Sequence, residues 1–247
     1  MITRILQRQI GLALFMGFCS IVTLIALASL AAILWSLVTQ GLEGMNLHVF
    51  TMSTPPAGSE GGLLNAIAGS IAMCLIGMAI AVVIGVLAGT WLAEYAHDSA
   101  FGSLVRFIND ILLSAPSIVI GLFVYGLFVA PLGGFSGFAG SIALALIATP
   151  VITRTTEDVL RLQPTSLREA SVGLGAPLWT TILLVLWRAA RAGIITGGLL
   201  AFARISGETA PLLFTALNNQ FFSLDLTKPT ASLPIVIYNF ALSAYDD

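Results

Sequence analysis

The sequence is short of charge. Only 9% of its 247 residues are Asp, Glu, Lys or Arg, whereas 57% are hydrophobic. A soluble domain carries about 25% charged residues, so this chain cannot build a water-facing surface over most of its length. Lipid must therefore cover much of it. The composition predicts an all-α, polytopic membrane protein with no room for a soluble catalytic domain.

Cysteine and histidine are also scarce, with two of each. Cys19 and Cys74 lie inside apolar runs, which is typical of small buried hydrophobes rather than of a disulfide or a metal pair. His48 and His97 lie far apart in short hydrophilic segments. The spacing matches neither a metal site nor a nucleophile–histidine pair, so we expect no catalytic residue and no metal ligand.

The nucleotide-binding pattern Gly-x-x-x-x-Gly-Lys-Ser/Thr is missing, and the only lysine is Lys228. The chain therefore cannot bind ATP through a P-loop. We expect it not to be an enzyme and to hold no cofactor of its own. If ATP drives its activity, a separate subunit binds the ATP and the magnesium.

Long apolar runs are what the sequence does contain. A bilayer crossing needs about 20 residues, and four of the five runs reach that length unaided. The first run is too long for the core of a signal peptide, although Ala26-Leu27-Ala28 resembles a cleavage site, so we interpret it as an uncleaved helix. The predicted spans of one membrane domain over 1–247 are 10–38, 65–93, 107–130, 135–153 and 192–217.

The basic residues orient these spans. If the helices alternate in direction, eight of the ten Lys and Arg residues fall on one side of the membrane. This positive-inside pattern predicts a cytoplasmic N-terminus. Five crossings then leave residue 247 outside, after a tail whose apolar piece, 233–242, is too short to cross. We therefore expect a further C-terminal span that this chain lacks.

Small residues recur at helical spacing in two of the spans. Gly85 with Gly89, and Gly193 with Gly197, form Gly-x-x-x-Gly pairs. Such pairs let helix backbones approach closely in lipid, but they also arise by chance in runs rich in Gly and Ala. We interpret them as packing positions and not as a site.

The longest hydrophilic loop, 154–191, is predicted to face the cytoplasm. Pro164 followed by Thr165 or Ser166 favours a helix start, and Gly175 favours a stop. A short helix across the mouth of a bundle suits docking into the groove of a partner. An ordinary solvated connector fits the same pattern.

Two charges, Arg204 and Glu208, lie within the last predicted span. At 1.5 Å per residue a span over 192–214 is roughly 34 Å long, which places Arg204 near the midplane. One such charge costs about 2.5–3.5 kcal/mol on insertion scales. The spacing of four puts both side chains on one helix face, where they can pair. The pair could pin helix packing, but Arg suits phosphate and carboxylate oxygens, so we favour an anion pathway.

Both features resemble one family of bacterial permeases. Glu169-Ala170-Ser171-x-x-x-Gly175 is similar to the EAA loop by which ABC-importer permeases dock onto their ATPase. The run Arg204-Ile205-Ser206-Gly207-Glu208-Thr209-Ala210-Pro211 resembles the signature of the PstA phosphate permeases, as do residues 92–96 and 116–123. The resemblance covers 63–240. The chain departs from the family at Trp187-Arg188, where Leu-Pro is usual, and in lacking the last helix.

The resemblance implies the fold of a type I ABC-importer permease in the bacterial inner membrane. It implies a path for inorganic phosphate shared with a PstC-like second permease, an ATPase dimer inside and a periplasmic phosphate-binding protein outside. The residues it places on the substrate path are Arg204, Ser206, Glu208 and Thr209. The residues it places in the ATPase-docking loop are Arg168, Glu169, Ala170, Ser171 and Gly175.

Other functions stay open on the residues alone. A self-sufficient anion channel or ion-coupled carrier could use Glu208 as a proton site. A membrane sensor or scaffold is a third class, but it has no need of charges at mid-depth. Within importers, sulfate, molybdate or phosphonate would suit an arginine equally, and only the family signature selects phosphate.

Overall fold

A computed structural model describes residues 2–56, 61–96 and 98–243, and the described chain is almost entirely helical, with no strand in those ranges. His97, which entered the predictions above, lies outside them. The chain divides into two units, 1–47 and 48–247. Within the described residues, four helical stretches are long and apolar enough to cross a membrane, and a bent pair of helices makes a fifth if it counts as one broken span.

The first unit is one long helix, α1 (Ile2–Gly44), which contains the predicted first span. Its stretch Arg8–Leu42 is long enough to cross a bilayer. The described side chains of α1, Cys19 among them, are exposed along its length because the unit contains nothing for them to pack against. A short helix, α2 (Leu47–Thr51), follows at the boundary of the units.

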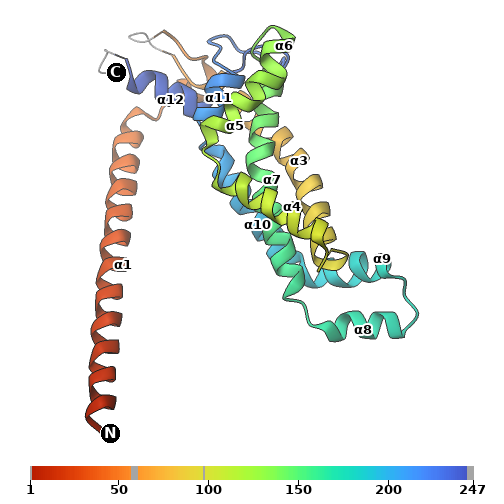
Figure 1. Ribbon diagram of the computed structural model, residues 1–247. Helices are drawn as coiled ribbons and strands as arrows, with labels where there is room; N and C mark the ends of the chain where they lie inside the picture. Colours follow the sequence, from red (N-terminus) through yellow and green to blue (C-terminus); the bar gives the residue numbers. More distant parts are fainter. Residues whose placement is uncertain (1, 57–60, 97, 244–247) are drawn as a thin grey trace. The chain divides into compact units, whose positions relative to one another are not determined.

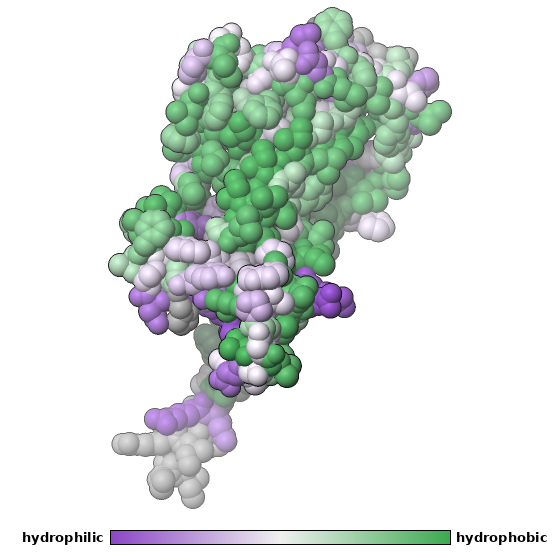
Figure 2. Space-filling view, turned by 90° about the vertical axis from the view of Figure 1, so that its right-hand side faces the viewer, coloured by the Kyte–Doolittle hydropathy of each residue, from purple (hydrophilic) through white to green (hydrophobic). Residues whose placement is uncertain are grey.

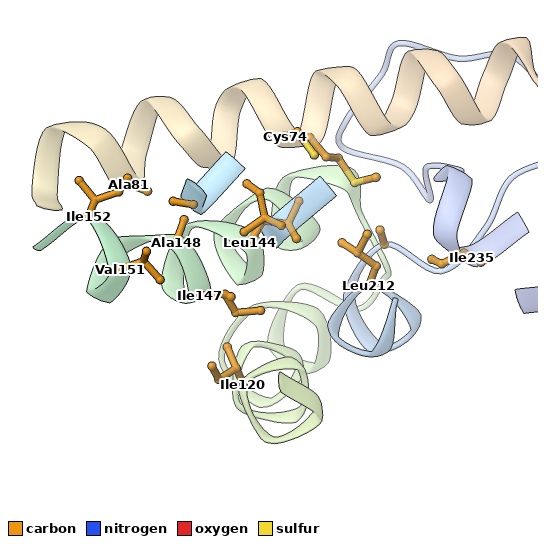
Figure 3. Close-up of a cluster of buried hydrophobic side chains, with 14 residues drawn as sticks. Cys74, Ala81, Ile120, Leu144, Ile147, Ala148, Val151, Ile152, Leu212 and Ile235 are labelled. Atoms are coloured by element: carbon orange, nitrogen blue, oxygen red, sulfur yellow. The ribbon is translucent and has the colours of Figure 1, made fainter. Parts of the chain in front are cut away.

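The core of the second unit is formed by α3 (Leu64–Glu94), α7 (Gly137–Arg161) and α10 (Trp187–Ser206), with α7 packed against both of the others (Figure 1). Cys74 and Ala81 of α3 meet Leu144, Ala148 and Ile152 of α7 in the largest buried cluster (Figure 3). The expectation that Cys74 is a small buried hydrophobe is confirmed. The face of this unit that Figure 2 shows is largely hydrophobic along its middle, and most of its hydrophilic side chains lie toward the two ends.

Glycines bring these helices together. A Cβ at Gly85 would lie 2.8 Å from the side chain of Ile152, and one at Gly89 would lie 2.7 Å from that of Thr156. On α10, a Cβ at Gly193 would lie 2.6 Å from Val159, and Gly197 directly faces Thr155. Both Gly-x-x-x-Gly pairs therefore pack against α7, which confirms their interpretation as packing positions.

The predicted third span, 107–130, is not one continuous helix. It consists of α4 (Ala100–Ser114) and α5 (Ser117–Val124), followed by a π-helical segment, η1 (Tyr125–Val129), and α6 (Ala130–Leu132). The bend between the two halves is 105°. Pro116 causes it, because proline lacks a backbone N–H and drives the preceding residue out of the helical conformation. Ala115 is accordingly extended, with a ψ of 134°.

The predicted loop 154–191 is much shorter in the structure. α7 continues to Arg161, and the next membrane-spanning stretch begins at Leu178 with α9 (Leu178–Thr180) and a π-helical segment, η2 (Thr181–Leu186), before α10. Charged residues extend α7 rather than end it, because Arg154 pairs with Asp158 and Arg161 with Glu157 at helical spacing. The short helix expected between Pro164 and Gly175 is confirmed as α8 (Thr165–Gly173).

The predicted last span, 192–217, is broken. α10 ends at Ser206, residues 207–209 are not helical, and α11 (Ala210–Thr215) follows. Gly207 disfavours continuation of α10, and Pro211 suits the start of a new helix because the first N–H groups of a helix have no partner in any case. Arg204 and Glu208 therefore do not share one helix face, and that prediction was wrong.

The two ends of the bundle differ. α6, α11 and α12 (Leu233–Ala241) lie at one end, called the α12 end, and α8 and α9 lie at the other, called the α8 end (Figure 1). At the α12 end Asn65 donates to the carbonyl of Asn219 at 2.6 Å and accepts from the backbone and hydroxyl of Thr54. α12 is too short to cross a bilayer, as expected for the apolar piece 233–242.

Candidate functional site

The break after α10 lies beside the middle of α7. Ile205, the residue after Arg204, is 1% exposed and belongs to the buried cluster that contains Leu144, Ala148 and Ile152, in the central part of α7. The last turn of α10 is therefore held against the central part of α7. Non-helical backbone at membrane depth is tolerated where it is buried in protein or lines a water-filled cavity.

α11 is fixed on the far side of the break by α5. A Cβ at Gly121 would lie 2.6 Å from the Cα of Pro211, so the two backbones touch without an intervening side chain. Leu212 is 3% exposed in the same cluster as Ile205. Packing thus holds the helices on both sides of residues 207–209, and these residues connect two rigid elements.

Arg204 lies in the last turn of α10 with its side chain exposed. It makes no ion pair or hydrogen bond to any residue in the described ranges, and the expected pair with Glu208 is not formed. Glu208 is half-buried, and its backbone N–H donates to the carbonyl of Ile205 at 3.2 Å. All five N–H groups of the Arg204 guanidinium are therefore free to donate hydrogen bonds to an oxyanion.

Two hydroxyl residues flank Glu208. Ser206 is exposed, and its Oγ donates to the carbonyl of Phe202 at 2.7 Å, which leaves the oxygen free only to accept. Thr209 is half-buried, and its carbonyl accepts the N–H groups of Leu212 and Leu213 at the start of α11. The structure thus brings Arg204, Ser206, Glu208 and Thr209 into one short segment, although not onto one helix face.

A groove of about 300 Å³ runs between α7 and α10 toward the α8 end. It is lined by Thr155, Asp158, Val159, Gly193, Thr196, Gly197 and Leu200. Leu200, the lining residue nearest to Arg204 in the sequence, lies one helical turn before it on α10. Gly193 and Gly197 let α10 approach α7 closely here, with Val159 and Thr155 packed against them. The sequence signal for this groove was the Gly193–Gly197 pair, which we had interpreted only as packing.

Glu157 organises the α8 end, and sequence reasoning missed it. This carboxylate is 1% exposed and accepts from Arg106 of α4 at 2.7 Å and from Arg161 at 2.8 Å. The guanidinium of Arg106 also donates to the carbonyls of Leu92 and Ala96, at 3.0 and 3.1 Å. A cation there stabilises the carbonyl end of α3. The spacing of Glu157 and Arg161 was the readable signal.

Arg168 of α8 points toward the bundle and not away from it. Its Nε donates to Oε2 of Glu94 at 2.9 Å and its Nη2 to Oε1 at 2.5 Å. The same guanidinium donates to the carbonyls of Leu160 and Gln163, at 2.9 and 3.0 Å. The hydrogen bond to Glu94 raises the pKa of Arg168 above its ordinary value, although burial acts in the opposite direction.

The other residues of the predicted docking loop fall into two groups. Glu169 and Ala170 are exposed. Ser171 is half-buried, with its Oγ 2.8 Å from Oγ1 of the fully buried Thr181. Gly175 has a φ of +82°, a conformation that other residues rarely adopt, and it turns the chain back toward α9. Only part of the loop is therefore available to a partner.

Trp187 ties the start of α10 to α3. Its indole N–H donates to Oγ1 of Thr90 on α3 at 3.1 Å. Because no proline interrupts the backbone, helical structure continues from Leu178 to Ser206. The neighbouring Arg188 is exposed and forms no ion pair within the described part of the chain.

Comparison with known proteins agrees with this architecture. Residues 81–244 match the family described as binding-protein-dependent transport system inner membrane component. The phosphate transport system permease protein PstA of Haemophilus influenzae is 52% identical over 234 residues, which cover 95% of this chain and 83% of that protein. The protein of the same name from Pasteurella multocida is 54% identical over 215 residues, covering 87% and 77%.

A solved structure shares the fold. A chain of the MetNI methionine ABC transporter, determined in inward-facing conformations, superposes with a TM-score of 0.62 over 73% of this chain and 80% of that chain. The sequence identity is 21%, so this similarity concerns the fold alone. It is the fold of an ABC-importer permease, which confirms the fold that the family resemblance implied.

Proposed function

The chain belongs to the PstA family of phosphate transport system permeases, and we propose that it forms the membrane path of an ATP-driven importer of inorganic phosphate. It is a multi-pass inner membrane protein. A second, PstC-like permease completes the path, a separate ATPase dimer binds ATP and magnesium, and a periplasmic binding protein delivers phosphate. The positive-inside pattern places the N-terminus and the α8 end in the cytoplasm.

The observation that supports the path most strongly is the free guanidinium of Arg204 at the break between α10 and α11. An unpaired charge at mid-depth is costly unless it faces water or a polar partner. Discontinuous helices near the midplane are where many transporters bind substrate. Arg204 combines both properties in one place.

Each residue at the break has a role in this proposal. Arg204 compensates the phosphate charge with its planar fork of donors. The hydroxyls of Ser206 and Thr209 accept hydrogen bonds from protonated phosphate oxygens. Glu208 repels fully ionised anions and keeps the affinity for phosphate low. Low affinity is needed because transport requires release as well as binding. Phosphate then leaves along the groove between α7 and α10.

ATP acts on this path through α8. The exposed Glu169 and Ala170 face the ATPase, and so do two apolar side chains beside the helix, Leu162 and Leu174, which are 79% and 90% exposed. Exposed apolar groups at the end of a bundle are typical of a docking surface. ATP binding moves α8 and opens the path outward, and hydrolysis returns the path inward.

Phosphate uptake by the assembled importer in proteoliposomes tests the proposal. Arg204→Gln keeps a similar length and polarity but removes the charge, and we expect uptake to be abolished while the subunits still assemble. Arg191→Gln is the matched control, because Arg191 is also exposed on α10 and forms no ion pair within the described ranges. Unchanged uptake by Arg204→Gln would contradict the role of Arg204 in the path.

A further inference from the structure

The position of α8 depends on few contacts. None of its residues is fully buried. Its half-buried Leu167 packs beside the cluster that contains Leu160 and Leu186. The remaining ties to the bundle are polar, from Arg168 and from Ser171. A helix with so little apolar burial is held in place mainly by its best polar contact.

Arg168 is that contact. Its guanidinium bonds both oxygens of Glu94, at the end of α3, and two carbonyls at the end of α7. The side chain of Glu94 is 4% exposed and that of Arg168 is 24% exposed. The guanidinium therefore makes its hydrogen bonds within the bundle, and little of the Arg168 side chain is exposed to another protein.

The ends of α3 and α7 are themselves joined. Arg106 of α4 links the carbonyl of Leu92 on α3, and that of Ala96 just after α3, to the carboxylate of Glu157 on α7. The two span helices therefore present one rigid block to α8, and Arg168 is the side chain that fastens α8 to both of them.

We propose that Arg168 is a positioning residue that fastens α8 to the ends of α3 and α7 and does not contact the ATPase, so that a push on α8 moves both span helices. The inference rests on the proposed function, in which the ATPase docks on α8. Arg168 belongs to the predicted docking loop, where we expected it to contact the ATPase. In this proposal it instead transmits the movement of α8 to α3 and α7. Its partner Glu94 lies outside the predicted docking loop.

Two quantities are measured in the assembled importer: the amount of ATPase retained on purification, and the phosphate taken up per ATP hydrolysed. Only the second should depend on Arg168. Arg168→Met keeps an unbranched apolar stem and removes the hydrogen-bond donors. We expect it to retain the ATPase and its basal hydrolysis, while uptake per ATP falls about tenfold, equivalent to about 1.4 kcal/mol of lost coupling. The matched control is Arg188→Met, which removes an exposed, unpaired cation from the same end of the bundle.

Two further variants show whether Arg168 and Glu94 act as a unit. Glu94→Gln should lower uptake per ATP in the same way, and combining it with Arg168→Met should add nothing, because both changes break one contact. Arg168→Lys keeps the charge but loses the fork, so we expect partial uptake per ATP. If Arg168→Met fails to assemble, Arg168→Lys carries the same comparison.

Loss of the ATPase from Arg168→Met or Arg168→Lys, with retention in Glu94→Gln, would overturn the proposal and make Arg168 a docking contact. Unchanged uptake per ATP, or an equal loss in Arg188→Met, would overturn it as well. Absence of phosphate uptake by the unaltered importer would instead refute the proposed function. ATPase retention would still decide whether Arg168 contacts the ATPase.

Discussion

Replacing Glu157 by alanine removes the one carboxylate that Arg106 and Arg161 share. The side chains of Glu157 and Arg106 are 2% and 17% exposed, so this pair is largely desolvated. Breaking such a pair by removing one partner costs about 3–5 kcal/mol, because a buried charge is left uncompensated. Arg106 keeps two carbonyl partners, which places the expected loss near about 3 kcal/mol. The side chain of Arg161 is 35% exposed, so water can solvate its charge when Glu157 is removed, and Arg161 adds little to the loss.

The next residue along the chain provides the matched control. Asp158 pairs with Arg154 at 3.3 Å, but the two side chains are 54% and 46% exposed. An exposed pair at this spacing contributes about 0–1 kcal/mol. The assay is the midpoint of thermal unfolding of the purified chain in detergent. At about 2–4 °C per kcal/mol for a chain of this size, Glu157→Ala should lower the midpoint by roughly 6–12 °C and Asp158→Ala by roughly 0–4 °C. Equal shifts in the two variants would refute the assignment of Glu157 as the centre of the α8 end.

Two other changes test how the spans pack. Gly197→Val places a branched side chain against Thr155 and should destabilise the packing of α7 and α10 by about 1–3 kcal/mol, whereas Gly198→Val, at a position with open space, should change the stability by less than about 0.5 kcal/mol in the same unfolding assay. Trp187→Phe keeps the aromatic bulk but leaves Thr90 without its donor, and should cost about 1 kcal/mol. A Trp187→Phe variant as stable as the parent chain would show that the hydrogen bond to Thr90 contributes nothing measurable and that the packing of the ring holds α10 against α3.

Hydropathy was enough to predict the membrane fold but not the shape of its helices. The apolar runs and the family motifs led to the correct architecture and to α8. The errors lie where local chemistry overrides hydropathy. Pro116 bends the third span, Gly207 and Pro211 break the last one, and ion pairs of Glu157 and Asp158 carry α7 beyond the end of its apolar run.

The candidate site shows the same division. The two charged residues Arg204 and Glu208 identified the segment of the candidate site. Their spacing of four predicted an ion pair, which does not form because α10 ends at Ser206. The pairing of Arg168 with Glu94 joins residues 74 positions apart, and that of Arg106 with Glu157 joins residues 51 apart. No pattern within one helix reveals such contacts, since they depend on how α3, α4, α7 and α8 meet.

The central claim is that phosphate passes the break after α10, and protection of a cysteine placed there tests it most directly. Ser206→Cys is nearly isosteric and lies two residues from Arg204. With Cys19 and Cys74 replaced, its reaction with a charged thiol reagent can be followed in the assembled importer, with phosphate or with chloride at equal ionic strength. We expect phosphate, but not chloride, to slow the labelling of this cysteine. Labelling at the same rate in both salts would contradict a phosphate path at Arg204.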